Sequence, residues 1–170
     1  MLEESGGSQH VIQHCLKVME VAKRLTRQVE CQGIKVNAEL VETAAILHDI
    51  GRSKTHDLAH GLLGGNILSE RGLPEDLRRA VERHVGAGIG EEEAVRLGLE
   101  RKDLIPETIE EKIVCYADKL VDGAEEVPFD DTLRYFERKF GKGHPIVVRL
   151  KELHRYFTEL GTMEGKLNTS

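Results

Sequence analysis

The segment AELVETAAILHDIG, residues 38–51, constrains the fold more than any other part of the chain. Its second half, beginning at Ala44, is apolar nearly all round, which predicts a helix end that is buried on every side. His48 and Asp49 lie inside this apolar run, and a buried carboxylate without a partner is costly in free energy. Burial of this pair is therefore expensive unless other groups compensate for it.

Helical periodicity extends over most of the remaining chain. From Gln9 to about Cys31, apolar residues recur every three or four positions. Asn37 is a suitable N-cap for the helix that carries His48, and Thr108 with Glu111 matches a capping box. No segment shows a convincing strand alternation, so the sequence predicts an all-α bundle of about six to eight helices. Further helices are expected at residues 57–70, 74–84, 91–99, 109–122, 131–140 and 144–160.

The length of 170 residues is most simply one domain with its own core. We expect a flexible N-terminal segment over residues 1–8, a helical domain over 9–160 and a flexible tail over 161–170. The stretch VGAGIG, residues 85–90, lacks the preceding strand and the following Lys-Ser/Thr of a P-loop, so it is interpreted as a connector.

Composition restricts the partners and the compartment. The net charge of -6 and the aromatic content of 4% argue against extended nucleic-acid binding, although a small anionic substrate remains compatible with local cations. No window approaches about 18 uninterrupted apolar residues, so no membrane span is expected. Cys15, Cys31 and Cys115 form no C-x-x-C pair and are interpreted as reduced thiols, which together with the polar N-terminus favours a cytoplasmic protein.

Four other residues repeat the chemistry of the His48-Asp49 pair. Neutral imidazole and carboxylate are ligands that divalent metals accept, and one carboxylate can bridge two ions. A cation would also compensate for the buried charge. The sequence therefore predicts a site for one or two divalent metal ions, with Mn, Fe, Co, Ni, Mg and Zn all left open, built from His14, His48, Asp49, His60, His84 and Asp118.

Taken singly, several of these residues also fit a structural role. His48 could be a hydrogen-bonded core histidine, and His84 could interact with the dipole at the end of its helix. His56 forms an H-x-x-x-H pair with His60, but it lies in a polar loop and is expected to be a surface or supporting residue. Candidate phosphate contacts are Arg52, Lys54 and Lys119, with Arg83 the weaker one; the alternative for each is solvated surface charge.

The order of these motifs resembles a known family. The run LHDIGR, residues 47–52, with His14 before it and YADKL, residues 116–120, after it, resembles the HDIG-type form of the HD-domain superfamily of metal-dependent phosphohydrolases. The segments from His60 to Gly64 and Arg83-His84 look like the two additional histidines of its dinuclear members.

The resemblance covers roughly residues 9–123, and residues 124–160 carry no motif of the family, so they are assigned to shaping the pocket. It implies that Asp49 bridges two metal ions and is the central catalytic residue. The first ion would be held by His14, His48, Asp49 and Asp118, and the second by Asp49, His60 and His84.

The resemblance implies hydrolysis of a phosphoester or phosphoanhydride bond of a small nucleotide-like substrate by metal-activated water. The layout is closest to small bacterial HD hydrolases of dinucleoside polyphosphates. One alternative is an HD-type di-iron oxygenase, because His and carboxylate suit iron as well as manganese. The other is a non-catalytic HD sensor or scaffold, against which the complete set of six ligands argues. The expected partner is a phosphorylated small molecule, and a homodimer is left open.

Overall fold

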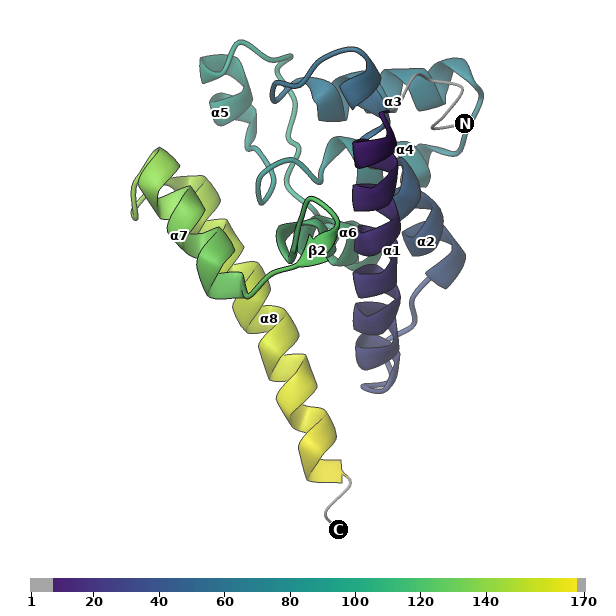
Figure 1. Cartoon of the computed structure of the whole chain (residues 1–170), viewed down its shortest axis with the longest axis vertical. Coiled ribbons are helices and arrows are strands. Elements are labelled where there is room, and N and C mark those ends of the chain that lie inside the picture. Colours follow the sequence, from purple (N-terminus) through teal and green to yellow (C-terminus); the bar gives the residue numbers. More distant parts are fainter. Residues whose placement is uncertain (1–7, 168–170) are drawn as a thin grey trace.

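The computed structural model describes residues 8–167, and it is helical apart from one small hairpin (Figure 1). The predicted all-α class is therefore confirmed. The helices are α1 (Gln9–Glu30), α2 (Ala38–Leu47), the 3₁₀ helix η1 (Ile50–Ser53), α3 (His60–Glu70), α4 (Glu75–Glu82), α5 (Glu91–Arg96), α6 (Ile109–Lys119), α7 (Phe129–Phe140) and α8 (Pro145–Leu167). Strands β1 (Val121–Asp122) and β2 (Glu125–Glu126) pair antiparallel.

Both helix caps predicted from the sequence are present. The Asn37 side chain accepts a hydrogen bond from the Leu40 N–H at 3.1 Å, at the start of α2. Thr108 Oγ1 accepts the Glu111 N–H at 3.2 Å, and the Glu111 carboxylate accepts the Thr108 N–H in return. Each bond satisfies a backbone N–H that has no partner inside its own helix.

Four helices, α2, α4, α5 and α6, end earlier than the sequence predicts. α2 stops at Leu47, so His48 and Asp49 lie in a turn before η1 instead of inside a regular helix. α6 stops at Lys119 instead of about Asp122, because the chain turns there into the hairpin of β1 and β2. The turn of this hairpin contains Gly123, whose φ of 57° lies in the left-handed region that favours glycine.

The main core lies between α1, α2, α4 and α6, and α8 covers part of it from the other side (Figure 1). The apolar stripe predicted for the first helix is buried at every position: Val11, Cys15, Val18, Ala22, Leu25 and Val29. This packing fixes the helices that carry the site. All three cysteines are free, as expected for reduced thiols.

The last two helices are arranged differently. α7 lies alongside the N-terminal part of α8 (Figure 1) and has no fully buried residue of its own. Its apolar side rests on a smaller core formed by Ala87, Ile146 and Leu150. α8 runs to Leu167 and is longer than predicted. Of the ends expected to be flexible, residues 1–7 and 168–170 lie outside the described residues.

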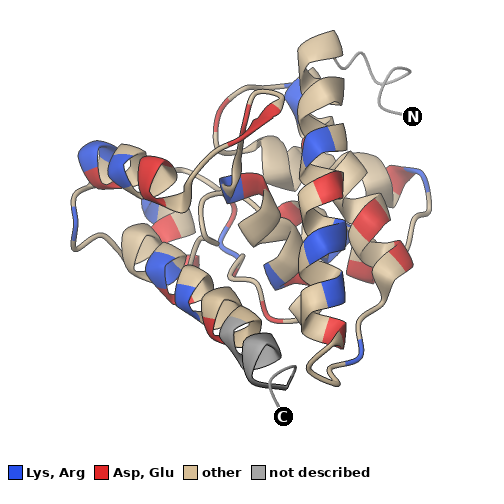
Figure 2. Ribbon diagram, turned by 60° about the horizontal axis from the view of Figure 1, so that its bottom comes forward, with Lys and Arg blue, Asp and Glu red and all other residues tan. Residues whose placement is uncertain are grey.

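Charges of both signs cover the surface. Figure 2 shows Lys and Arg interspersed with Asp and Glu along the helices. No helix within residues 8–167 is both long enough and apolar enough to cross a bilayer.

Candidate metal centre

The fold brings all six predicted ligands into one cluster. His14 lies on α1, His60 begins α3, and His84 follows α4. The imidazole of His48 lies between two carboxylates, with its Nε2 3.8 Å from Asp49 Oδ2 and 3.5 Å from Asp118 Oδ1. On the other side of Asp49, its Oδ1 lies 3.2 Å from His60 Nε2 and 3.5 Å from His84 Nε2.

Each of the four imidazoles is held through its Nδ1, which donates to a backbone carbonyl oxygen. In three of them the carbonyl belongs to the residue three positions earlier, so the local chain sets the ring orientation. His14 differs, because its carbonyl partner comes from the distant hairpin. With Nδ1 as the donor, each Nε2 presents a lone pair to the cluster, as a metal ligand requires. The distances are 2.8 Å for His14 to Gly123, 2.7 Å for His48 to Ala45, 2.6 Å for His60 to Asp57 and 2.6 Å for His84 to Val81.

Two buried atoms in the cluster lack a hydrogen-bond partner. Among the described residues, His48 Nε2 and Asp49 Oδ1 are buried and unsatisfied. The Nε2 atoms of His60 and His84 lie 3.0 Å apart, and with both Nδ1 atoms protonated two lone pairs face each other. An unsatisfied buried polar group costs about 1–3 kcal/mol. A cation bound between these atoms would satisfy all of them, so the residues fit a metal ion.

Three sets of ligand atoms lie close enough together to hold an ion. Within each set the atoms lie no more than 4.8 Å apart, and all three sets were found within the described part of the chain. His48, Asp49 and His84 each belong to two of the sets, and of these three only Asp49 has two carboxylate oxygens with which it could bridge two ions. The sets are His14, His48 and Asp49; His48, His84 and Asp118; and Asp49, His60 and His84.

The protonation states of Asp49, Asp118 and His84 suit metal binding. His48 differs, because neighbouring acidic groups raise its pKa despite its burial, so that a metal ion would displace a proton there. Burial raises the pKa of Asp49 and Asp118, but the imidazoles around Asp49 and the ammonium of Lys119 beside Asp118 hold both values below the ordinary range. Burial lowers the pKa of His84 to about 4. Near neutral pH both carboxylates are therefore charged and His84 is neutral, the forms in which these side chains coordinate metals.

Two of the three predicted phosphate contacts lie at the cluster. Arg52 donates from Nε to Asp49 Oδ2 at 2.6 Å, and the buried Lys119 pairs with Asp118. Lys54 is exposed and lines neither cavity beside the cluster. Arg83, the weaker candidate, donates to the Ile105 carbonyl oxygen and pairs with Glu111, so its role is structural.

Two cavities flank the cluster. A cavity of about 490 Å³ includes His60 and His84 in its wall, and one of about 540 Å³ includes His14. Residues common to both walls are Arg52, Asp118, Lys119, Tyr135 and Phe136. The exposed His56 lies at the wall of the first cavity and is not part of the metal cluster.

The α7 side chains in these walls were missed by sequence reasoning. Tyr135, Phe136 and Lys139 line the first cavity, and Arg138 lines the second. The signal that could have found Tyr135 and Lys139 is a second stripe on α7, beside the apolar one, at positions 132, 135 and 139. Residues 124–160 therefore contribute to the pocket wall, as the sequence suggested.

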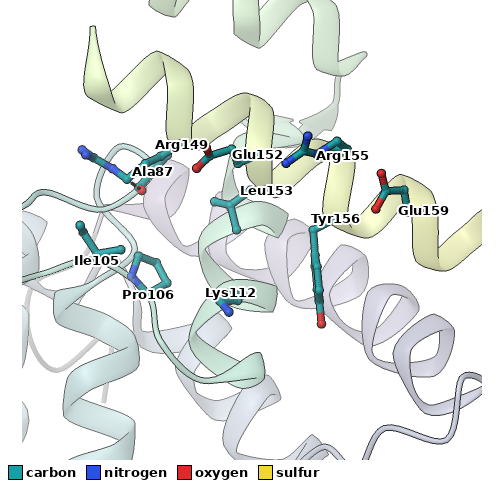
Figure 3. A pocket seen from close by; sticks show the side chains of 10 residues that line it. All are labelled: Ala87, Ile105, Pro106, Lys112, Arg149, Glu152, Leu153, Arg155, Tyr156 and Glu159. Atoms are coloured by element: carbon teal, nitrogen blue, oxygen red, sulfur yellow. Dashed lines mark hydrogen bonds between the residues drawn. The ribbon is translucent and has the colours of Figure 1, made fainter.

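A third cavity, of about 540 Å³, lies between α6, α8 and the segment at Ile105 and Pro106 (Figure 3). It contains none of the six clustered ligands. Its Arg149 donates to the carbonyl oxygens of Ala87 and Gly88 and pairs with Glu93, so this cation ties α8 to the glycine-rich connector. The chemistry of the cluster is therefore confined to the first two cavities.

The family is shown by comparison with known proteins. The HD domain family matches residues 11–121, which contain all six clustered residues, and the chain belongs to this family. It is similar to the Uncharacterized protein MJ0778 of Methanocaldococcus jannaschii, with 48% identity over 143 residues that cover 84% of this chain and 85% of that protein.

A second relative is larger than this chain. The tRNA (cytidine(56)-2'-O)-methyltransferase of Picrophilus torridus is 38% identical over 166 residues, which cover 98% of this chain but only 46% of the methyltransferase. The chain thus spans less than half of that protein.

Solved structures agree with the fold. The HD domain of the phosphodiesterase PgpH of L. monocytogenes, in complex with cyclic-di-AMP, superposes with a TM-score of 0.58 at 16% identity, over 99% of this chain and 98% of that one. At this identity the likeness supports the fold alone.

Proposed function

We propose that this protein is a metal-dependent phosphohydrolase that cleaves a phosphoester or phosphoanhydride bond of a small nucleotide-like substrate. The observation that carries the proposal is the buried set of Nε2 and carboxylate atoms around Asp49, two of them without a hydrogen-bond partner, beside a cavity that also contains Arg52 and Lys119. The first feature suits divalent cations and the second suits a phosphate.

In the proposed centre, His14, His48, Asp49 and Asp118 hold one ion, and Asp49, His60 and His84 hold a second. Bound ions would polarise a phosphoryl oxygen and lower the pKa of a water molecule. Phosphoryl transfer requires little beyond positioning and electrostatic stabilisation. The described residues would supply the positioning and the electrostatic stabilisation, so the proposed reaction needs no nucleophilic side chain.

The residues around the ligands would bind and orient the substrate. Arg52 uses Nε to hold Asp49, and because a guanidinium has five N–H donors it can hold a phosphoryl oxygen at the same time. Lys119 neutralises Asp118 and lines both cavities, so the charge of the bound ions would be left to act on the substrate. This local charge would attract an anionic substrate to a chain whose net charge is -6.

The names of similar proteins also support a nucleotide-like substrate. A ribonuclease Y of Rubrobacter xylanophilus is 24% identical over 136 residues, which cover 79% of this chain and 22% of that protein. Like the tRNA (cytidine(56)-2'-O)-methyltransferase, it is a relative whose name indicates an RNA substrate.

The test combines metal analysis with a phosphate-release screen. Elemental analysis of the purified protein should find divalent metal, and added Mn, Co, Ni or Mg should support phosphate release from a narrow group of nucleotides. Bound iron without release of phosphate from any nucleotide would contradict the proposal and favour the oxygenase alternative.

The number of ions is tested with His60→Ala. This variant should lose one equivalent of metal and keep its fold, because His60 contacts the proposed second ion only. If both the metal content and the rate stay at the wild-type level, the site holds one ion, and His60 would then act on the substrate.

A further inference from the structure

The feature that carries a further inference is the side of α7 that faces the metal cluster. Thr132 Oγ1 donates to the Lys119 carbonyl oxygen at 2.7 Å, which fastens α7 beside the end of α6. Thr132, Tyr135 and Lys139 follow one another at helical spacing, so they share one side of α7. The apolar side, with Leu133, packs on the smaller core instead.

Tyr135 is an exposed aromatic residue beside the metal cluster. Half of it, 50%, is exposed, although its neighbour Phe136 is partly buried. Tyr135 lines both cavities beside the metal cluster, together with Arg52 and Lys119. The ring is therefore not needed to fill the core, and it stands next to the cations assigned to phosphate.

The orientation of this ring is held by Lys139, one turn further along α7. The Lys139 ammonium donates to the Tyr135 hydroxyl at 3.3 Å and lies 5.6 Å from the centroid of the Tyr135 ring. It also lies 5.3 Å from the Phe140 ring. A cation in this place restricts the motion of the tyrosine, of which half remains exposed.

We infer that Tyr135 is the specificity-determining residue that stacks against the base of a nucleotide substrate, and that Lys139 positions its ring. The inference rests on the proposed function, since it places the phosphates at Arg52 and Lys119. An aromatic ring stacks on any nucleobase, so the subsite distinguishes nucleotides from phosphates that lack a base more strongly than it distinguishes one base from another.

Binding of a matched pair of probes tests the inference without turnover. The first probes are the α,β-methylene diphosphates of adenosine, guanosine, cytidine and uridine, and the second is methylenediphosphonate, which lacks the nucleoside. Calorimetric titration in the presence of Mn²⁺ should show tighter binding of at least one nucleoside probe than of methylenediphosphonate. In Tyr135→Ala this preference should fall roughly tenfold or more, because stacking on an aromatic side chain is lost.

Two further variants distinguish the loss of stacking from a nonspecific effect of the substitution on binding. Tyr135→Phe keeps the ring and should retain the preference for nucleoside probes. Val148→Ala removes another exposed apolar side chain, 45% exposed and outside the three cavities described, and should bind both probes as the wild type does. Equal binding of all probes by the wild type, or an unchanged preference in Tyr135→Ala, would overturn the inference.

The binding test of the stacking role can succeed or fail independently of the test of hydrolysis. If the protein releases phosphate but binds all probes without regard to the base, the proposed hydrolase function stands and the stacking role of Tyr135 is contradicted. Base-dependent binding that requires Tyr135, with no release of phosphate from any nucleotide, would support the stacking role and contradict the hydrolase.

Discussion

The helices up to α6 and the helices α7 and α8 contribute to the same pocket in different ways. The first group supplies all six clustered ligands from buried or half-buried positions. α7 has no fully buried residue and supplies exposed side chains such as Tyr135 and Lys139. A metal centre needs fixed ligand atoms, whereas a wall that selects a substrate needs side chains that the substrate can reach.

Two glycines, Gly51 and Gly143, illustrate this contrast at particular positions. A Cβ on Gly51 would lie 1.9 Å from the His60 carbonyl oxygen and 2.7 Å from the Gly64 nitrogen, so the backbone of η1 touches that of α3. At Gly143, between α7 and α8, no atom lies within 4 Å of an added Cβ. The backbones of η1 and α3, beside the ligands, are thus packed directly against each other, whereas the connection between the last two helices is open. Four predictions test this difference.

The largest effect is expected at Asp49, which belongs to two of the ligand sets. Asp49→Ala should remove bound metal and lower the rate of phosphate release by more than about a hundredfold, because even the loss of a residue that only supports a ligand costs roughly 10–100-fold. Elemental analysis and initial rates measure both effects. Full activity in this variant would show that the cluster is not the catalytic site.

Gly51→Ala should lower the free energy of unfolding by about 1–3 kcal/mol or more, since backbone atoms cannot move aside for the added methyl group. Gly143→Ala is the matched control and should leave stability unchanged or raise it by up to about 1 kcal/mol. Urea denaturation measures both. Equal effects at the two positions would contradict the contrast in packing.

Arg52 and Lys54 are neighbouring cations with different surroundings. Arg52→Ala should lower kcat/KM by roughly 10–100-fold, because Asp49 loses its guanidinium partner. Lys54→Ala should change it by no more than about twofold, because an exposed side chain outside both cavities is lost. A comparable loss in both variants would mean that Lys54 reaches the substrate.

The smallest effect concerns His154 on α8, whose Nδ1 accepts a hydrogen bond from the Tyr116 hydroxyl at 2.7 Å. Burial lowers the pKa of His154 below 6.5, and the nearby Asp130 only partly opposes this shift. The folded state therefore binds fewer protons than the unfolded state below about pH 6.5, so the contribution of this histidine is present above that pH and is lost as the pH falls.

Urea denaturation at about pH 7.5 and about pH 5.5 measures how much the free energy of unfolding falls between these two pH values. This fall should be slightly smaller in His154→Gln than in the wild type. The comparison between the two proteins removes the contribution of every other titrating group. The same pH dependence in both would show that His154 does not couple α8 to proton binding.

Local patterns in the sequence predicted much of the architecture. The buried stripe of α1 and the caps at Asn37 and Thr108 follow from side-chain spacing and from hydrogen bonds within a few residues, and the structure confirms them. The six candidate ligands could be named because His and Asp in apolar surroundings need a compensating cation. Membership of the HD domain family agrees with that pattern.

Contacts between distant segments decided the rest. The end of α6 at Lys119 depends on the hairpin, whose Gly123 carbonyl oxygen fixes the His14 ring across more than a hundred residues of sequence. The separation of Arg83 from the pocket depends on its ion pair with Glu111. Sequence spacing predicts that Tyr135 lies on the same side of α7 as Thr132 and Lys139. Only the packing of α7 against α8 brings that side beside the metal cluster. The sequence therefore determined the candidate ligands, and the tertiary packing decided which cations and aromatic rings surround them.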